Sequence, residues 1–211
     1  MERDVEDKHG RRAAHGDAPR SAGQQAAEPR YRKPFKPDKE RILEAILFLI
    51  GRTSGLSQHE IVKSLFLADR AHLNTYGRPI TFDNYVAMEH GPVPSLAYNA
   101  LEPSFNFSKI FKEERPWVTI RDGNKNRFVN PKRGFRKDVL SKTDIDALES
   151  ALQTIKTLSV SQIRRLTHDD PAYKEAWSRR GKAAAADMDM SKLLEDGDEE
   201  TIERLAYLTR C

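Results

Sequence analysis

Cysteine is almost lacking from this sequence of 211 residues, which has a single one, Cys211. One cysteine excludes an internal disulfide and every zinc site built on cysteine pairs. Long apolar runs are lacking too, because the longest, residues 42–50, is interrupted by Glu44. That run is far shorter than the ~18–20 apolar residues that cross a bilayer. We therefore expect a cytoplasmic protein that does not enter the membrane.

Neither sign of charge is in large excess. Lys and Arg number 36 and Asp and Glu 32, which leaves a net charge of +4 and a pI near 9.1. This small surplus permits nucleic-acid binding but does not indicate it. Charged residues make up 32% and apolar residues 38%, against typical values of about 25% and about 45–50%. We expect residues 1–37 to be a disordered, charged extension and residues 38–211 to form one folded domain.

A long helix with clear ends is predicted after residue 56. Ser57 and Glu60 have the spacing of a capping box, in which each side chain satisfies a free backbone amide near the other. Gly77 is suited to the left-handed conformation that ends a helix, and Pro79 prevents continuation.

Two polar residues of this helix, Asp69 and His72, fall in or beside its buried face. A buried aspartate is costly unless it is paired. We expect Asp69 to accept hydrogen bonds from His72, from Arg78 or from free amides of the turn over residues 77–81.

The other predicted elements complete an α+β fold that is mainly α, a compact helical domain with a small antiparallel sheet or hairpin. They are a buried helix capped by Asp38, a strand over 80–88 ended by Gly91 and Pro92, a helix from Pro94 to 101, a hairpin over 117–130, and helices over 141–158, 159–166, from Pro171, and over 199–210.

Glu89 and His90 stand next to a chain reversal specified by Gly91, Pro92 and Pro94. Catalysis would need a nucleophile, a base and an orienting group in one place, and the sequence has no GxSxG, HExxH, phosphate-binding loop or GxGxxG motif. The histidines His59, His72 and His90, with Asp69 or Glu89, match no metal-ligand spacing. We expect no enzyme activity, no metal and no cofactor, and a structural or partner-facing role for this pair.

A helix-turn-helix that reads DNA is the alternative. The helix pair over residues 39–76 would present a second helix that is only mildly basic. Its exposed positions would be Gln58, His59, Lys63, Leu67, Arg70 and Asn74. The basic runs over 130–137, 164–165 and 179–182 could contact phosphates, although such runs are more often solvated.

The stretch over residues 63–101 closely resembles the Panacea-domain family, the SocA-like bacterial antitoxins. The family pattern is met by Leu67-Ala68-Asp69-Arg70, His72, Tyr76-Gly77, Pro79-Ile80 and the run from Tyr85 to Ser95. The segment from His168 to Trp177 is similar to the closing helix of the family.

The resemblance implies an antitoxin that neutralises its cognate protein toxin by direct contact. It also implies, for the SocA branch, an adaptor that delivers the toxin to a cytosolic AAA+ protease. The candidate residues for binding the partner or fixing the corner are Asp69, His72, Arg78, Glu89 and His90, and the structural turn residues are Gly77, Pro79, Gly91, Pro92 and Pro94. Glu89 and His90 would either tie the corner to the helix of Asp69 and His72 or line a groove beside it.

Overall fold

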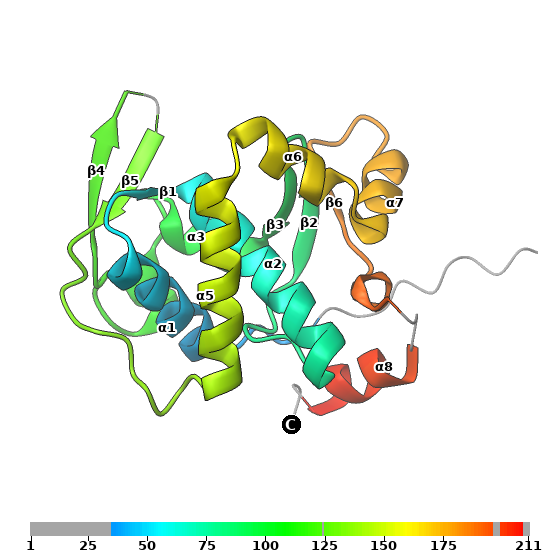
Figure 1. Cartoon of the computed structure of the whole chain (residues 1–211), viewed down its shortest axis with the longest axis horizontal. Helices are drawn as coiled ribbons and strands as arrows, with labels where there is room; N and C mark the ends of the chain where they lie inside the picture. Colours follow the sequence, from blue (N-terminus) through cyan, green and yellow to red (C-terminus); the bar gives the residue numbers. More distant parts are fainter. Residues whose placement is uncertain (1–34, 124, 196–198, 209–211) are drawn as a thin grey trace, which may run out of the picture. The chain divides into compact units, whose positions relative to one another are not determined.

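The computed structural model describes residues 35–123, 125–195 and 199–208 (Figure 1). The chain divides into two units, residues 1–30 and 31–211, and all described residues belong to the second. Most of the predicted extension over 1–37 therefore lies outside the described residues. Phe35, however, is buried, so the packed part of the chain includes a residue that the prediction placed in the extension.

The fold is α+β and mainly α, as predicted. The helices are α1 (Lys39–Arg52), α2 (Gln58–Tyr76), α3 (Ser95–Leu101), α4 (Phe107–Phe111), α5 (Lys142–Thr157), α6 (Val160–His168), α7 (Pro171–Arg179) and α8 (Glu199–Leu208), with a 3-10 turn η1 (Met190–Leu193). The strands are β1 (Leu56–Ser57), β2 (Tyr85–Met88), β3 (Gly91–Pro94), β4 (Val118–Asp122), β5 (Lys125–Val129) and β6 (Ala185–Asp187). They form two antiparallel sheets in the orders β1-β5-β4 and β3-β2-β6.

The two first helices form the centre of the domain. Every residue of α1 from Ile42 to Ile50 is buried, which confirms the predicted central helix. The capping box of Ser57 and Glu60 is present at the start of α2, and Gly77 ends it with φ of 71° in the left-handed region. α5 packs along α2 (Figure 1), so the middle of α2 lies between other elements and not on the surface.

The predicted strand over 80–88 is correct only in its second half, β2. Residues 80–84 are irregular, and Phe82 has φ of 52°. Two buried carboxylates bind the amides that a sheet would need: Asp69 accepts from those of Ile80 and Thr81, and Asp83 accepts from that of Asn84. In residues 80–84, carboxylate oxygens thus accept hydrogen bonds from backbone amides that would pair with another strand in a sheet.

The prediction that Gly91 and Pro92 end the strand over 80–88 is also wrong. The chain reverses at Glu89 and His90, and β3 then pairs with β2 from Met88↔Gly91 to Tyr85↔Pro94. β3 is an edge strand of its sheet, where proline is tolerated because one side needs no amide donor. Pro94 is also the N-cap of α3, as predicted.

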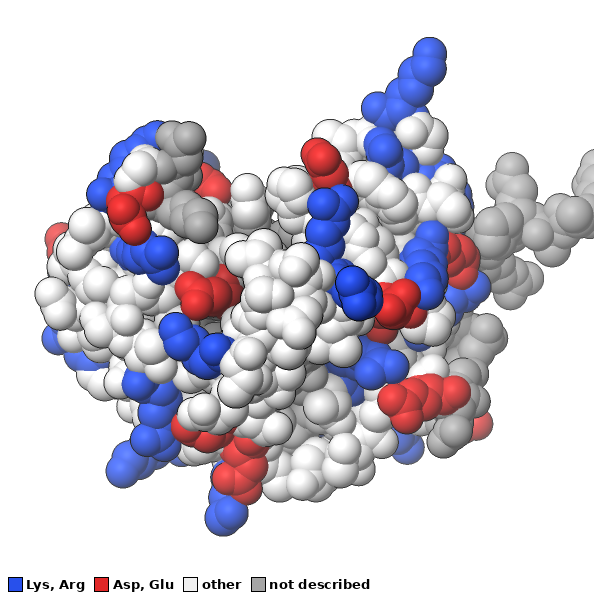
Figure 2. Space-filling model, turned by 45° about the horizontal axis from the view of Figure 1, so that its top comes forward, with Lys and Arg blue, Asp and Glu red and all other residues white. Residues whose placement is uncertain are grey.

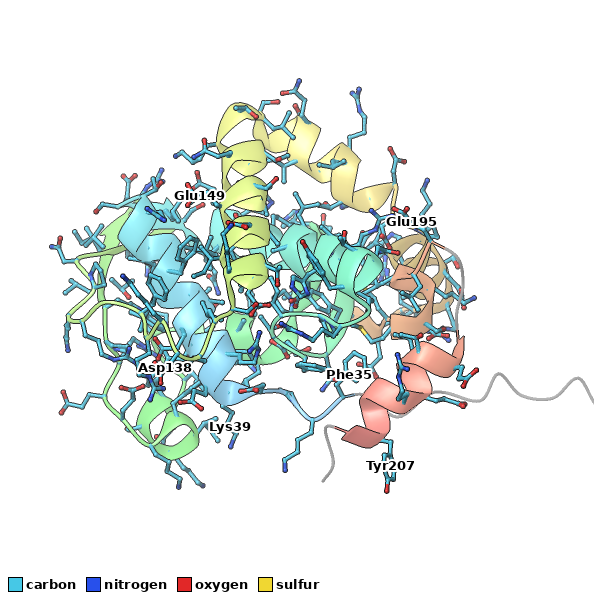
Figure 3. The ribbon with its side chains drawn as sticks, turned by 60° about the horizontal axis from the view of Figure 1, so that its bottom comes forward. Phe35, Lys39, Asp138, Glu149, Glu195 and Tyr207 are labelled. Carbon is cyan, nitrogen blue, oxygen red and sulfur yellow. The ribbon has the colours of Figure 1, made fainter. Side chains whose placement is uncertain are left out.

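The core consists of two clusters of buried side chains. One gathers around α1, α3 and the first half of α2, and includes Phe48, Trp117 and Phe128. The other joins Phe35 to Phe66, Tyr85, Tyr173 and Ile202. Figure 3 shows Phe35 on the segment before α1, and Tyr207 pointing outward from α8.

Candidate functional site

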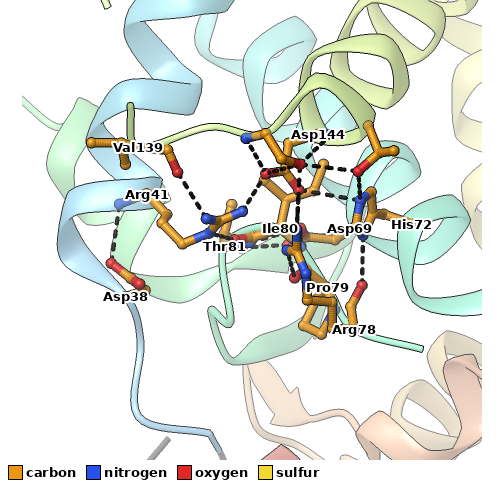
Figure 4. A network of polar contacts seen from close by, with 12 residues as sticks. Asp38, Arg41, Asp69, His72, Arg78, Pro79, Ile80, Thr81, Val139 and Asp144 are labelled. Atoms are coloured by element: carbon orange, nitrogen blue, oxygen red, sulfur yellow. Dashed lines mark hydrogen bonds and ion pairs between the residues drawn. The ribbon is translucent and has the colours of Figure 1, made fainter. Parts of the chain in front are cut away.

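Asp69 is the centre of a buried polar junction at the C-terminal half of α2 (Figure 4). Its Oδ1 accepts from the amides of Ile80 and Thr81 at 2.8 and 3.0 Å, and its Oδ2 accepts from the hydroxyls of Thr81 and of Tyr85, the latter at 2.7 Å. The carboxylate is 1% exposed, and its burial raises the pKa of Asp69 although these four donors oppose the shift. The prediction that Asp69 binds amides of the turn after α2 is confirmed.

His72 connects the same turn to the start of α5. The Nδ1 of His72 lies 2.8 Å from the carbonyl oxygen of Arg78, so Nδ1 donates, and Nε2 lies 3.0 Å from the Thr143 hydroxyl. Nε2 also lies 3.2 Å from Oδ1 of Asp144, which pairs with Arg78 at 3.0 Å. Burial lowers the pKa of His72.

Asp144 and Arg41 complete this junction. Asp144 accepts from the amide and hydroxyl of Ser141 at 2.7 and 2.8 Å, as the N3 residue of a capping box whose N-cap is Ser141. Burial acts to raise the pKa of Asp144, but the Ser141 hydrogen bonds and the Arg41 charge outweigh it and hold that pKa below its ordinary value. Arg41 also donates to the carbonyl oxygens of Ile80 and Val139, at 2.6 and 2.8 Å. The junction therefore joins α1, α2, α5 and the turn between α2 and β2.

Two arginines of the basic run over 130–137 pair with a buried carboxylate of the protein itself. Glu44 is fully buried in α1, and Arg133 and Arg136 donate to its carboxylate at 2.8–3.1 Å. The predicted DNA-reading face of α2 also needs correction, because Lys63 is 1% exposed and Leu67 and Arg70 are only partly exposed. A helix covered in this way does not present a free face to a DNA groove.

Glu89 and His90 lie elsewhere, on the rim of a groove beside the N-terminal half of α2. The groove consists of two adjoining pockets of about 620 and 650 Å³ that share Gln58, His59, His90 and Arg164; we call it the basic groove. Figure 2 shows the first pocket as the hollow between the β4–β5 hairpin, at upper left, and the neighbouring helices. The second lies between α2, the β2–β3 turn, α6 and α7.

The wall of the second pocket contains a buried lysine. The Nζ of Lys63 donates to the carbonyl oxygen of Pro92 at 2.8 Å. A Cβ at Gly91 would lie 2.7 Å from this Nζ and 2.9 Å from the Thr167 hydroxyl, and Gly91 has φ of 101°. Both the close approach and the backbone conformation therefore require glycine. Burial lowers the pKa of Lys63 to about 7.

The five candidate site residues thus divide between two places. Asp69, His72 and Arg78 meet in the buried junction, beside the buried Pro79, whereas Glu89 and His90 are exposed on the groove rim. Within the described chain, no hydrogen bond or ion pair joins the two groups. Arg41, Thr81, Tyr85 and Asp144 of the junction, and Lys63, Arg164 and Trp177 of the groove, were not predicted as site residues. The Ser141–Asp144 capping spacing was a usable signal for Asp144.

The junction offers little for chemistry, because the acceptors of Asp69 are occupied by donors from the protein itself. Nowhere in the described ranges do three or more His, Cys, Asp or Glu side chains gather as metal ligands would. Among the described helices, none combines the length and apolarity needed to cross a membrane. The described residues thus form a buried polar junction at one end of α2 and an open groove beside its other end.

Comparison with known families places most of these residues in one matched segment. Residues 61–177 match the sequence model of the family described as antitoxin SocA-like, Panacea domain. The match covers more than half of the chain and includes most of the junction and the groove wall from Val62 to Trp177. The protein belongs to this family of SocA-like antitoxins. No curated protein and no solved structure gives a significant match.

Proposed function

We propose that this protein is the antitoxin of a bacterial toxin–antitoxin pair and neutralises its cognate toxin in the cytoplasm by direct protein contact. The observation that carries the proposal is the family match, which spans α2, both strands of the β2–β3 hairpin and α6 and α7. These are the elements that surround the basic groove. Most of the second pocket's lining therefore lies in the segment that matches the family.

Binding, and not catalysis, is the action that the side chains support. The hydroxyl of Ser57, which lines the groove, is used in the capping box with Glu60. The rim histidine His90 has no serine or cysteine beside it among the groove residues to activate as a nucleophile. A recessed surface without an activated nucleophile is suited to holding a protein segment.

A finer role as a proteolytic adaptor belongs to the same proposal. Its support is the resemblance to the SocA branch alone. In that role the antitoxin would deliver the bound toxin to a cytosolic AAA+ protease, so the toxin should disappear faster in cells that contain the antitoxin. A toxin half-life that is unchanged by the antitoxin, together with full neutralisation, would leave sequestration as the mechanism.

The test is inducible expression of the neighbouring gene with and without this protein, followed by co-purification. We expect the neighbour to arrest growth, this protein to relieve the arrest, and the two to elute as one complex. Relief of the arrest without a complex would contradict neutralisation by contact. A neighbour that does not arrest growth would contradict the pairing of these two genes.

A further inference from the structure

The basic groove carries more positive than negative charge that is free to meet a partner. Arg127 and Lys156 line its first pocket, but both pair with Glu60, at 3.8 and 3.5 Å. In the second pocket, Lys63, Arg164 and Arg180 face one carboxylate, Glu89. Within the described chain none of these three cations has a carboxylate at ion-pair distance.

Lys63 shows this lack of a counter-charge most clearly. A buried ammonium normally needs an anionic partner, because leaving water is costly for a charge. Lys63 is 1% exposed, and a single carbonyl oxygen, that of Pro92, accepts from it in the described residues. An acidic group in the second pocket would supply the missing charge, and the lowered pKa of Lys63 would then return toward its ordinary value.

The same pocket holds cations and aromatic rings in fixed positions. The guanidinium of Arg180 lies 3.8 Å from the ring centroid of Trp177, and it donates to the Ala183 carbonyl oxygen at 2.7 Å. Trp177 stacks in turn on Tyr173. Arginine, tryptophan and tyrosine are the residues that dominate binding energy at interfaces, and a side chain that is already held in place loses less entropy on binding.

An apolar position completes the surface. Val160, at the start of α6, lines the first pocket and is 64% exposed. Tyr98 and Val93 line the second. A ligand that fills both pockets therefore meets apolar surface beside the cations.

We propose that the basic groove holds an acidic segment of the partner protein, in which carboxylate side chains flank an aromatic or aliphatic one. The carboxylates would face Lys63, Arg164 and Arg180, and the apolar side chain would pack against Trp177 or Val160. This inference rests on the proposed function for the identity of the partner. Nucleic acid fits less well, because Arg127 already pairs with Asp122 and Glu60, and Lys156 pairs with Glu60.

The experiment compares charge reversals on neighbouring residues of α6. Arg164 lines both pockets, whereas Arg165 is also exposed and lines neither. The dissociation constant of the complex with the co-purified neighbour would be measured by titration calorimetry at two salt concentrations. We expect Arg164→Glu to weaken binding about tenfold or more and Arg165→Glu to change it less than about threefold. Circular dichroism would verify that both variants are folded.

A substitution that should strengthen binding distinguishes a direct effect on recognition from a loss of folded protein. Glu89→Gln removes the one carboxylate that lines the second pocket and would repel an acidic partner, so binding should tighten about threefold or more, and misfolding cannot produce this result. Equal affinities for Arg164→Glu and Arg165→Glu would overturn the groove assignment and leave the antitoxin function standing. Absence of any complex with the unaltered protein would overturn both proposals. An Arg164→Glu effect on self-association or on DNA mobility, with partner affinity unchanged, would assign the groove to another occupant.

Discussion

Lys63 is a single residue whose burial should make the stability of the protein depend on pH. Its pKa is lowered by burial to about 7, whereas a lysine in the unfolded chain has a pKa of about 10.4. Between these values the unfolded chain holds a proton that the folded chain lacks, so the free energy of unfolding should increase with pH. The increase is at most about 1.4 kcal/mol per pH unit.

The measurement is urea unfolding at pH 7, 8 and 9 for the unaltered protein and for Lys63→Met. Methionine keeps the unbranched shape and cannot titrate, so its unfolding free energy should change much less over this range. An equal rise in both proteins would show that another group causes it.

Replacing the candidate residues Asp69 and His90 by alanine should change the stability of the protein by very different amounts. Asp69→Ala leaves two amides and two hydroxyls buried without an acceptor, and it should cost at least about 3 kcal/mol. His90 is exposed, so His90→Ala should change stability by less than about 0.5 kcal/mol. Chemical denaturation measures both, and comparable losses would contradict the division into junction and groove.

For single residues, the sequence indicated that Asp69 needs hydrogen-bond partners more clearly than it indicated which residues complete the junction. A buried aspartate beside a glycine and proline turn is a strong local signal, and the amides of that turn are close in sequence. Asp144 and Arg41, by contrast, come from helices far away along the chain, and no local pattern brings them to His72. The DNA-binding alternative expected Lys63 to be exposed. Helical spacing alone could not show that α6 and β3 cover this residue.

At the scale of elements, two glycines differ in whether their position tolerates a side chain: Gly91 in the β2–β3 hairpin and Gly51 in α1. Gly91→Ala should destabilise the protein by more than about 1 kcal/mol, since Gly91 has a positive φ and no room for a Cβ. Gly51 lies in α1 with no atom within 4 Å of a Cβ. Gly51→Ala should therefore stabilise by about 0.5–1 kcal/mol. Thermal unfolding of the two variants tests the contrast, and shifts in the same direction would contradict it.

The helices and the β4–β5 hairpin were largely predictable, and the shortest strands were not. An apolar run with an Asp38 cap identified α1, the Ser57–Glu60 capping box and apolar stripes identified α2, and apolar residues at helical spacing identified α5. β1 and β6 have two and three residues, too few for an alternating pattern, and their pairing depends on distant strands. The alternation over residues 80–88 was misleading in its first half because buried carboxylates there bind the backbone amides.

For the molecule as a whole, the segment before α1 is part of the packing. Phe35 contacts Phe82 edge to face at 5.8 Å, and its carbonyl oxygen accepts from Asn84 at 3.1 Å. Phe35→Ala in the full chain should cost about 3 kcal/mol. Tyr207→Ala, at a 69% exposed position (Figure 3), should cost less than about 0.5 kcal/mol. Calorimetric melting distinguishes them, and a Phe35→Ala melt equal to that of Tyr207→Ala would show that the segment adds nothing.

The sequence predicted only one rim of the groove and not its other walls. The motif around Glu89 and His90 identified one rim of the groove, since a specified turn with exposed polar residues favours partner contact. The opposite walls come from α6 and α7, and only folding brings them to the same place. The family resemblance supplied the function, because a groove has no sequence signature of its own.

The helix α2 borders both places: Asp69 and His72 near its C-terminal end lie in the junction, and Gln58 and Lys63 near its N-terminal end line the groove. The exposed groove side chain Arg164 forms no hydrogen bond or ion pair that holds the described fold together, while Asp69 and Tyr85 are committed to it. Substitutions on the rim therefore leave the frame intact, and those in the junction do not. Under the proposed function, a few substitutions on the rim would therefore change which toxin is bound, each in a protein that still folds.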